Sequence, residues 1–368
     1  MHETLRLRIQ LLCFILIAEP LSLPTSVGAT EIFAPTGAMA NPREFPVAAL
    51  LQDGQVLVLG GDTYYAARTA ELYDRTTGRF TVTNQNASQK PPSVDHGQGI
   101  AVRLQNGKVL VAGPDSAELY DPATRTFTST FGPMTTTRHF PAASLLPSGQ
   151  VLIVGGNDKH GQPLNSAEIY DPATDGFTLS SISLGFARCC ATATSLASGD
   201  VLIAGGKEGT VPVSDARIFD STTGAITSVT SMSVPRSGAT ATLLANGKVL
   251  IAGGCGTSGT SLATTDLYDP STGHFTSSTA SNMAVARCYA TATLLPTNQV
   301  LVAAGGSASA ETYDPVSTHF TATQPMQSAH YAAIAAVLSN GEVLVAGGAV
   351  SSAEIYEEDD IFIGGFDP

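Results

Sequence analysis

One six-residue pattern recurs seven times along this chain of 368 residues. Each copy is a run of β-branched and aliphatic residues followed by glycine, as in VLIAGG, and the copies begin at Val56, Val109, Val151, Val201, Val249, Val300 and Val343. Successive copies are separated by 53, 42, 50, 48, 51 and 43 residues. A repeat of this length indicates an architecture built from equivalent units, and a short, wholly apolar run predicts a strand that is buried on both faces.

Each copy lies in a longer unit that predicts four antiparallel strands. A strand of small residues precedes it, as in FPAASLLPSGQ, and a segment such as AEIYDP follows it. A last strand begins seven residues after the aromatic residue of that segment, at Phe80, Phe127, Phe177, Ile226, Phe275, Phe320 and Ile363. Such units must pack face to face, and a closed ring leaves no unpaired end. The sequence therefore predicts an all-β fold, a seven-bladed β-propeller of four-stranded antiparallel blades.

The unit resembles the kelch repeat, which has a glycine doublet after its second strand and a tyrosine a few residues later. This resemblance covers nearly all of residues 30–368 and implies a single kelch-type propeller domain. The chain departs from the family because it has no tryptophan, and phenylalanine stands where kelch blades usually carry one. In the second repeat Pro114 replaces the second glycine.

The two ends of the chain compete to complete the last blade. Residues 32–36 resemble a fourth strand, because Met39 precedes Arg43 by four residues just as Met134 precedes Arg138. We expect this N-terminal strand to close the ring. The C-terminal IFIGGF, residues 361–366, is the alternative.

The first 29 residues have the features of a secretory signal. Arg6 and Arg8 precede an apolar run from Ile9 to Ala18, which is too short to span a bilayer, and small residues lead up to Ala29. We expect cleavage there, export to the periplasm or medium, and no membrane span. We also expect no lipid anchor, because Leu12 stands before Cys13 where a small residue would be required.

Composition and motifs argue against several classes of function. The net charge is −13, whereas binding to nucleic acid requires clustered lysine and arginine. No Ser–His–Asp grouping, phosphate loop or paired-carboxylate motif stands out, and the glycine doublets lead toward strands and not into helices. We therefore expect no catalytic residue, no resident metal or cofactor, and a monomeric protein.

Two rings of residues are predicted where the innermost strands enter the central channel. The residue twelve before each repeat's valine varies from blade to blade, as expected of a binding surface: Glu44, Gly97, His139, Cys189, Ser237, Cys288 and Tyr331. The residue before it is basic in every blade, which indicates a structural role: Arg43, His96, Arg138, Arg188, Arg236, Arg287 and His330. We expect these basic residues to pair with the acids two positions before each tyrosine: Glu71, Glu118, Glu168, Asp266, Glu311 and Glu354.

Four cysteines follow the signal and are predicted on one side of three neighbouring blades: Cys189, Cys190, Cys255 and Cys288. Export would allow disulfides to persist. Cys189 and Cys288 are expected to be too far apart to bond. Bonds between Cys255 and Cys288, between Cys255 and Cys190, or between Cys189 and Cys190 all remain open, and stapling is favoured over metal binding.

Three functions fit these features. The first is a binding module for a protein or glycan, held by the loops at the channel mouth. The second is a copper radical oxidase, because the propeller is similar to that of galactose oxidase; this resemblance would place a copper-binding histidine at Ala332, after Tyr331, and His330 stands before the tyrosine instead. The adjacent Cys288 and Tyr289 are not expected to form the family's crosslinked pair. The third is a passive structural protein of the cell envelope.

Overall fold

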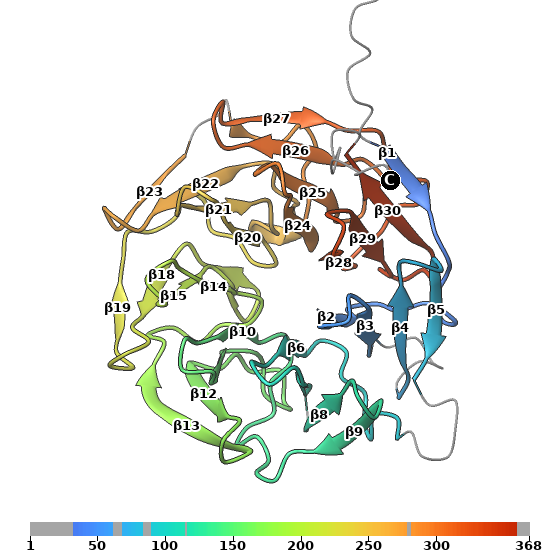
Figure 1. Cartoon of the computed structure of the whole chain (residues 1–368). Coiled ribbons are helices and arrows are strands. Elements are labelled where there is room, and N and C mark those ends of the chain that lie inside the picture. The colour runs from blue at the N-terminus through green and yellow to red at the C-terminus, as the bar shows by residue number, and fades with distance from the viewer. Residues whose placement is uncertain (1–31, 62–67, 84–89, 115, 278–280, 359–368) are drawn as a thin grey trace, which may run out of the picture.

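The repeated segments form seven separate four-stranded antiparallel sheets, arranged in a ring (Figure 1). The computed structural model describes residues 32–61, 68–83, 90–114, 116–277 and 281–358. Contacts between neighbouring innermost strands run around the whole ring, from the first blade to the seventh and back to the first. The predicted fold class, a seven-bladed β-propeller of four-stranded blades, is confirmed. The expected signal at residues 1–29 lies outside the described residues.

Each of the first six blades runs from its innermost to its outermost strand along the chain. The first three contain these strands: β2 (Val47–Leu50), β3 (Val56–Leu59), β4 (Ala70–Asp74) and β5 (Arg79–Val82); β6 (Ile100–Arg103), β7 (Val109–Ala112), β8 (Ala117–Asp121) and β9 (Thr126–Ser129); β10 (Ala142–Leu145), β11 (Val151–Val154), β12 (Ser166–Asp171) and β13 (Gly176–Ser183).

The next three blades contain these strands: β14 (Thr192–Ser195), β15 (Val201–Ala204), β18 (Ala216–Phe219) and β19 (Ile226–Ser228); β20 (Thr240–Leu243), β21 (Val249–Ala252), β22 (Thr265–Asp269) and β23 (His274–Thr276); β24 (Ala290–Leu294), β25 (Val300–Ala304), β26 (Glu311–Asp314) and β27 (His319–Ala322). A hairpin of β16 (Lys207–Glu208) and β17 (Val211–Pro212) and a short 3-10 turn, η1 (Thr257–Gly259), lie in the loops after β15 and β21. No helix in the described part of the chain is long and apolar enough to cross a membrane.

The seventh blade is built from both ends of the described chain. It contains β28 (Ile334–Val337), β29 (Val343–Ala346) and β30 (Ala353–Glu357), and its outermost strand is β1 (Ile32–Pro35). Phe33 lies opposite Tyr356 in this antiparallel pairing, and the centroids of the two rings are 5.1 Å apart. The N-terminal strand is therefore the outermost strand of the last blade, as expected. Residues 361–366, the alternative for this position, lie outside the described residues.

The second strand of every blade supplies the core. All four residues of β3, β7, β11, β15, β21 and β29, and all five of β25, are buried. The glycine doublet then lets the backbone approach the next blade: Gly156, with a φ of +92°, donates a hydrogen bond to the Arg188 carbonyl at 2.9 Å. A Cβ atom on Gly155 would lie 2.3 Å from the same carbonyl oxygen, so only glycine fits there.

A buried basic side chain ties the strands of each blade together. Arg138 shows the pattern: its guanidinium donates to the Glu168 carboxylate at 2.8 Å and to the Gly155 carbonyl at 2.7 Å, and both charged side chains are fully buried. The carboxylate also accepts the backbone N–H of Thr135 at 2.7 Å, which fixes the loop entering the blade. The same pairing of a basic residue with an acid recurs in Arg43–Glu71, His96–Glu118, Arg236–Asp266, Arg287–Glu311 and His330–Glu354. His96 differs in that its Nδ1 atom has no hydrogen-bond partner among the described residues.

The fourth blade uses a different acid, which the spacing rule did not include. Arg217 occupies the position two residues before the blade's aromatic residue, where the other blades have Asp or Glu. Arg188 pairs instead with Asp215, which lies two residues earlier in the chain and also binds Arg217. The buried guanidinium is therefore neutralised from the loop and not from the strand.

Substitution of Glu168 by glutamine should destabilise the propeller by about 3 kcal/mol, because it leaves the Arg138 charge buried without a counter-charge. Burial already lowers the pKa of Arg138, and Glu168 opposes that change. Urea unfolding followed by circular dichroism measures the loss. As a control, Lys108→Gln removes a half-exposed pair with Asp121 and should cost less than about 1 kcal/mol. Equal losses in the two variants would contradict the structural role.

Candidate functional site

Seven residues with left-handed backbone surround the mouth of the central channel, one in each blade. Their φ values lie between 50° and 62°, and they are Phe45, Gln98, Phe140, Cys190, Gly238, Tyr289 and Ala332. Each comes two residues after the buried basic residue and just before the innermost strand. A left-handed conformation is rare for residues other than glycine, asparagine and aspartate, so its recurrence in seven blades indicates a common constraint.

That constraint is a ring of backbone hydrogen bonds around the channel. The N–H of each of these residues donates to the carbonyl of its counterpart in the preceding blade, with N···O distances of 2.7–3.2 Å, at six positions: Gln98 to Phe45, Phe140 to Gln98, Cys190 to Phe140, Gly238 to Cys190, Tyr289 to Gly238 and Ala332 to Tyr289. The left-handed conformation directs the N–H of each residue toward the preceding blade and its C=O toward the following blade. We call these seven residues the mouth ring.

The mouth ring lies one residue after the ring predicted from spacing. The predicted residues, namely Glu44, Gly97, His139, Cys189, Ser237, Cys288 and Tyr331, precede its members directly. Several of them pair through their backbone with the loop after the glycine doublet, as His139 does with Asn157 and Ser237 with Cys255. Cys189, Ser237 and Cys288 are buried, and Tyr331 is the one large exposed side chain among the seven.

The mouth ring lines a funnel of about 240 Å³ whose walls combine aromatic and small side chains with polar groups. The ring centroid of Phe45 lies 5.0 Å from that of Phe140 and 5.2 Å from that of Tyr289. Tyr331 joins the group, at 5.8 Å from Tyr289 and 6.1 Å from Phe45. All four contacts are edge-to-face, the arrangement that aromatic quadrupoles favour. Four blades thus contribute to one aromatic cluster: Phe45, Phe140, Tyr289 and Tyr331.

Sequence reasoning missed three members of this cluster, although a signal for them exists. Phe45, Phe140 and Tyr289 each stand two residues after the basic residue, in REFP, RHFP and RCYA. Spacing alone cannot show which of two adjacent residues faces a channel, because a left-handed residue reverses the side-chain direction expected along an extended strand.

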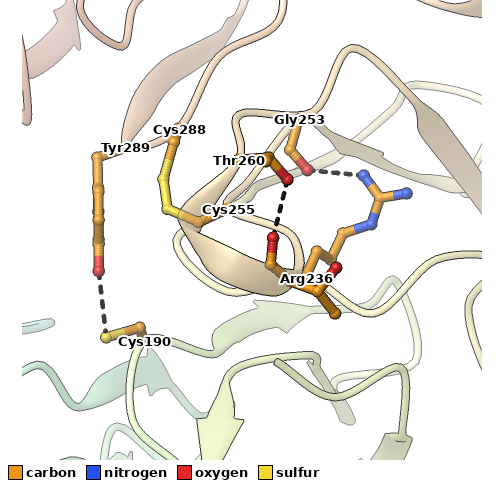
Figure 2. Close-up of a disulfide and its surroundings, with 8 residues drawn as sticks. Cys190, Arg236, Gly253, Cys255, Thr260, Cys288 and Tyr289 are labelled. Atoms are coloured by element: carbon orange, nitrogen blue, oxygen red, sulfur yellow. Dashed lines mark hydrogen bonds between the residues drawn. A yellow bond between two sulfur atoms is a disulfide. The ribbon is translucent and has the colours of Figure 1, made fainter. Parts of the chain in front are cut away.

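Cys190 and Tyr289 meet across the funnel. The Tyr289 hydroxyl donates to the Cys190 sulfur at 3.5 Å (Figure 2). The sulfurs of Cys189 and Cys190 lie 3.2 Å apart. When Cys190 is ionised, the Cys189 thiol can donate to its sulfur, and this hydrogen bond lowers the pKa of Cys190; the Tyr289 hydroxyl and the positive charge of Lys207 act in the same direction, against the effect of burial. Burial raises the pKa of Tyr289, so its hydroxyl remains a donor.

The other two cysteines form a disulfide. Cys255 lies in the loop after the glycine doublet of the fifth blade, and Cys288 precedes the innermost strand of the sixth; their Cα atoms are 5.0 Å apart (Figure 2). Of the three pairings left open by the sequence, the structure contains this one, and Cys189 and Cys190 are free thiols. The bond staples two neighbouring blades beside the funnel.

Copper, which the resemblance to galactose oxidase implies, does not fit the side chains at this mouth. His330 is fully buried, and its two ring nitrogens face the Gly347 carbonyl at 2.5 Å and Glu354 at 3.4 Å. Ala332 stands on the funnel wall where the family's ligand would be. Within the residues that the structure describes, no group of three or more His, Cys, Asp or Glu side chains is placed to hold a metal ion.

Comparisons with known proteins agree with this architecture. The fold itself defines a β-propeller, and residues 140–177, which span most of the third blade, match the kelch motif. This match confirms the resemblance to kelch repeats. Curated protein sequences contain no match to the chain.

Two solved structures share the fold at low identity. A fungal alcohol oxidase of the AA5 family, in complex with copper, is 16% identical and superimposes with a TM-score of 0.74 over 89% of this chain and 76% of that one. The structure of YjhT is 13% identical, with a TM-score of 0.56 over 78% of this chain and 99% of that one. At these identities the likeness shows the fold alone.

Gly238→Ala should displace the Tyr289 ring from the funnel. A Cβ atom on Gly238 would lie 2.7 Å from Cε1 of Tyr289, and overpacking of this kind costs about 1–3 kcal/mol. Gly247→Ala is the matched control, because Gly247 also has a positive φ, of +81°, but open space around its Cα. We expect a larger loss of unfolding free energy in Gly238→Ala, together with a changed near-ultraviolet circular dichroism spectrum from tyrosine. Identical stability and spectra in the two variants would show that Tyr289 is not held by this contact.

Proposed function

We propose that this kelch-type propeller is a binding module that takes a protein or glycan partner at the mouth of its channel. The observation that carries this proposal is the aromatic cluster: Phe45, Phe140 and Tyr289 line the funnel, and Tyr331 packs on Phe45 and Tyr289 beside it. Aromatic side chains supply large, rigid contact areas and dominate many recognition surfaces. The hydrogen bonds of the mouth ring hold the backbones of Phe45, Phe140 and Tyr289, so that little ordering is needed on binding.

The size of the funnel limits what enters it. Pockets for small-molecule ligands commonly measure about 300–1,000 Å³, and this funnel holds about 240 Å³. One sugar ring or one amino-acid side chain matches that space better than a whole cofactor does. The remainder of the partner would then lie over the rim, where Tyr331 is 38% exposed.

We also propose that the protein is exported. The basic and apolar pattern of residues 1–29 supports this, and so does the Cys255–Cys288 disulfide, because such bonds persist in oxidising compartments. The acidic net charge of −13 favours partners other than nucleic acid.

Replacement of both Phe140 and Tyr331 by alanine should weaken binding of the partner at least tenfold, because loss of one aromatic anchor commonly costs more than about 1 kcal/mol. Partners are found by probing an array of neutral oligosaccharides and a crosslinked native secretome with the exported chain. Isothermal titration then gives the affinity of each hit.

Phe131→Ala is the control for this experiment, because it removes a 90% exposed aromatic ring that lies outside the funnel. It should leave the affinity unchanged. Unchanged affinity in the double variant, with a native circular dichroism spectrum, would place the binding surface elsewhere on the propeller.

A further inference from the structure

We propose that Cys190 is a nucleophilic thiol on the wall of the funnel that exchanges with small-molecule disulfides, and that Cys189 resolves the resulting adduct. The site is the pair of adjacent free cysteines at the start of the fourth blade. This inference concerns a covalent reaction of the protein's own thiols and does not rest on the proposed binding of a partner.

The two sulfurs have different surroundings, which assigns them different roles. Cys190 lines the funnel and is 9% exposed, whereas Cys189 is 1% exposed. A reagent that enters the funnel therefore meets Cys190 first. Their sulfurs are 3.2 Å apart, so Cys189 is placed beside any adduct on Cys190. Closing the bond requires the backbone at Cys189 and Cys190 to adjust, because a disulfide usually joins Cα atoms at least about 4.4 Å apart and a trans peptide holds neighbours about 3.8 Å apart.

Hydrogen bonds on both sides hold the two residues in this arrangement. The N–H of Cys190 donates to Phe140 at 3.0 Å, and its carbonyl accepts from Gly238 at 2.9 Å. The N–H of Cys189 donates to the Lys207 carbonyl at 3.1 Å, and its carbonyl accepts from the Lys207 N–H at 2.9 Å. These backbone bonds keep Cys190 on the funnel wall and Cys189 directly before it.

The charged and titratable groups around Cys190 favour its thiolate. Cys189 and Tyr289 provide hydrogen-bond donors, and Lys207 provides a positive charge. Tyr331 lies on the other side of Tyr289, and burial raises its pKa, so it carries no negative charge near neutral pH. The pKa of Cys189 is raised, chiefly by its hydrogen bond with Cys190 and by burial. An attacking thiol is most effective when its pKa is near the ambient pH, which describes Cys190 and not Cys189.

The reaction balances in two steps. The Cys190 thiolate attacks a small-molecule disulfide, RSSR; that S–S bond breaks, one thiolate RS⁻ leaves, and a Cys190–S–S–R bond forms. Cys189 then gives its proton to the released RS⁻ and attacks the Cys190 sulfur; the second RS⁻ leaves and takes up a proton from water, and a Cys189–Cys190 disulfide remains. The two protein thiols are oxidised by two electrons, and RSSR is reduced to two thiols.

The test uses 5,5′-dithiobis(2-nitrobenzoic acid), an aromatic disulfide that releases a coloured thiolate, on protein treated with a mild reductant and desalted. Peptide mass analysis must first show that Cys255–Cys288 is intact. We expect wild-type protein to release two equivalents of thiolate and to keep no adduct. Cys189→Ser should release one equivalent and keep a stable adduct on Cys190. Cys190→Ser should react at least about tenfold more slowly than wild-type protein, because its remaining thiol, Cys189, is buried and seldom ionised.

A pH profile separates a reactive Cys190 from a merely accessible one. The rate of Cys190 alkylation by iodoacetamide should rise with pH to a midpoint below the ordinary thiol value of about 8.5 in wild-type protein, and Tyr289→Phe should shift the midpoint upward because the thiolate loses a donor. The inference is overturned if Cys190→Ser and Cys189→Ser react equally fast, if wild-type protein keeps a stable adduct, if thiolate is released only on unfolding, or if the midpoint lies at the ordinary thiol value of about 8.5.

Discussion

The buried basic residue at the start of each blade holds the propeller together within blades and between them. Arg188 illustrates the point: its side chain binds the Gly205 carbonyl and Asp215 of its own blade, and its backbone carbonyl accepts the N–H of Gly156 from the blade before. Removing such a charge from water is costly unless every partner is present. Repetition of this arrangement therefore fixes how each blade sits against the next.

The mouth ring follows from the same constraint. Its members stand two residues after the basic residue. The buried basic residue therefore fixes their backbone position around the channel, whatever side chain they carry. Their backbones link consecutive blades through hydrogen bonds, and their side chains are free to differ, from the absent side chain of Gly238 to the phenol of Tyr289. A uniform backbone thus carries a variable surface, which is how rigid scaffolds commonly support recognition.

The sequence predicted the blades better than the site, for physical reasons. Seven apolar runs ending in glycine leave few arrangements that bury both faces of every sheet, so the ring could be foreseen, and the regular basic position pointed to buried ion pairs. The left-handed residue could not be foreseen: it shifts the channel-facing position from His139 to Phe140, and Phe140 has no feature of its own that requires this backbone. Asp215 was missed because an acid from a loop can replace one from a strand. The disulfide depended on how closely the loop of Cys255 approaches Cys288, a distance that blade spacing does not determine.

The four cysteines show how one face of the ring supports two kinds of sulfur chemistry. Cys255 of the fifth blade forms a disulfide with Cys288 of the sixth. This bond links the two blades beside the funnel, and neither of its sulfurs is available as a thiolate. Cys190 belongs to the mouth ring, and its left-handed backbone turns its sulfur toward Tyr289 while Cys189 lies behind it. Tyr289 is shared between the aromatic cluster and the thiol, because its ring packs on Phe45 and Tyr331 while its hydroxyl binds Cys190. The proposed binding surface and the proposed reactive thiol thus meet at Tyr289.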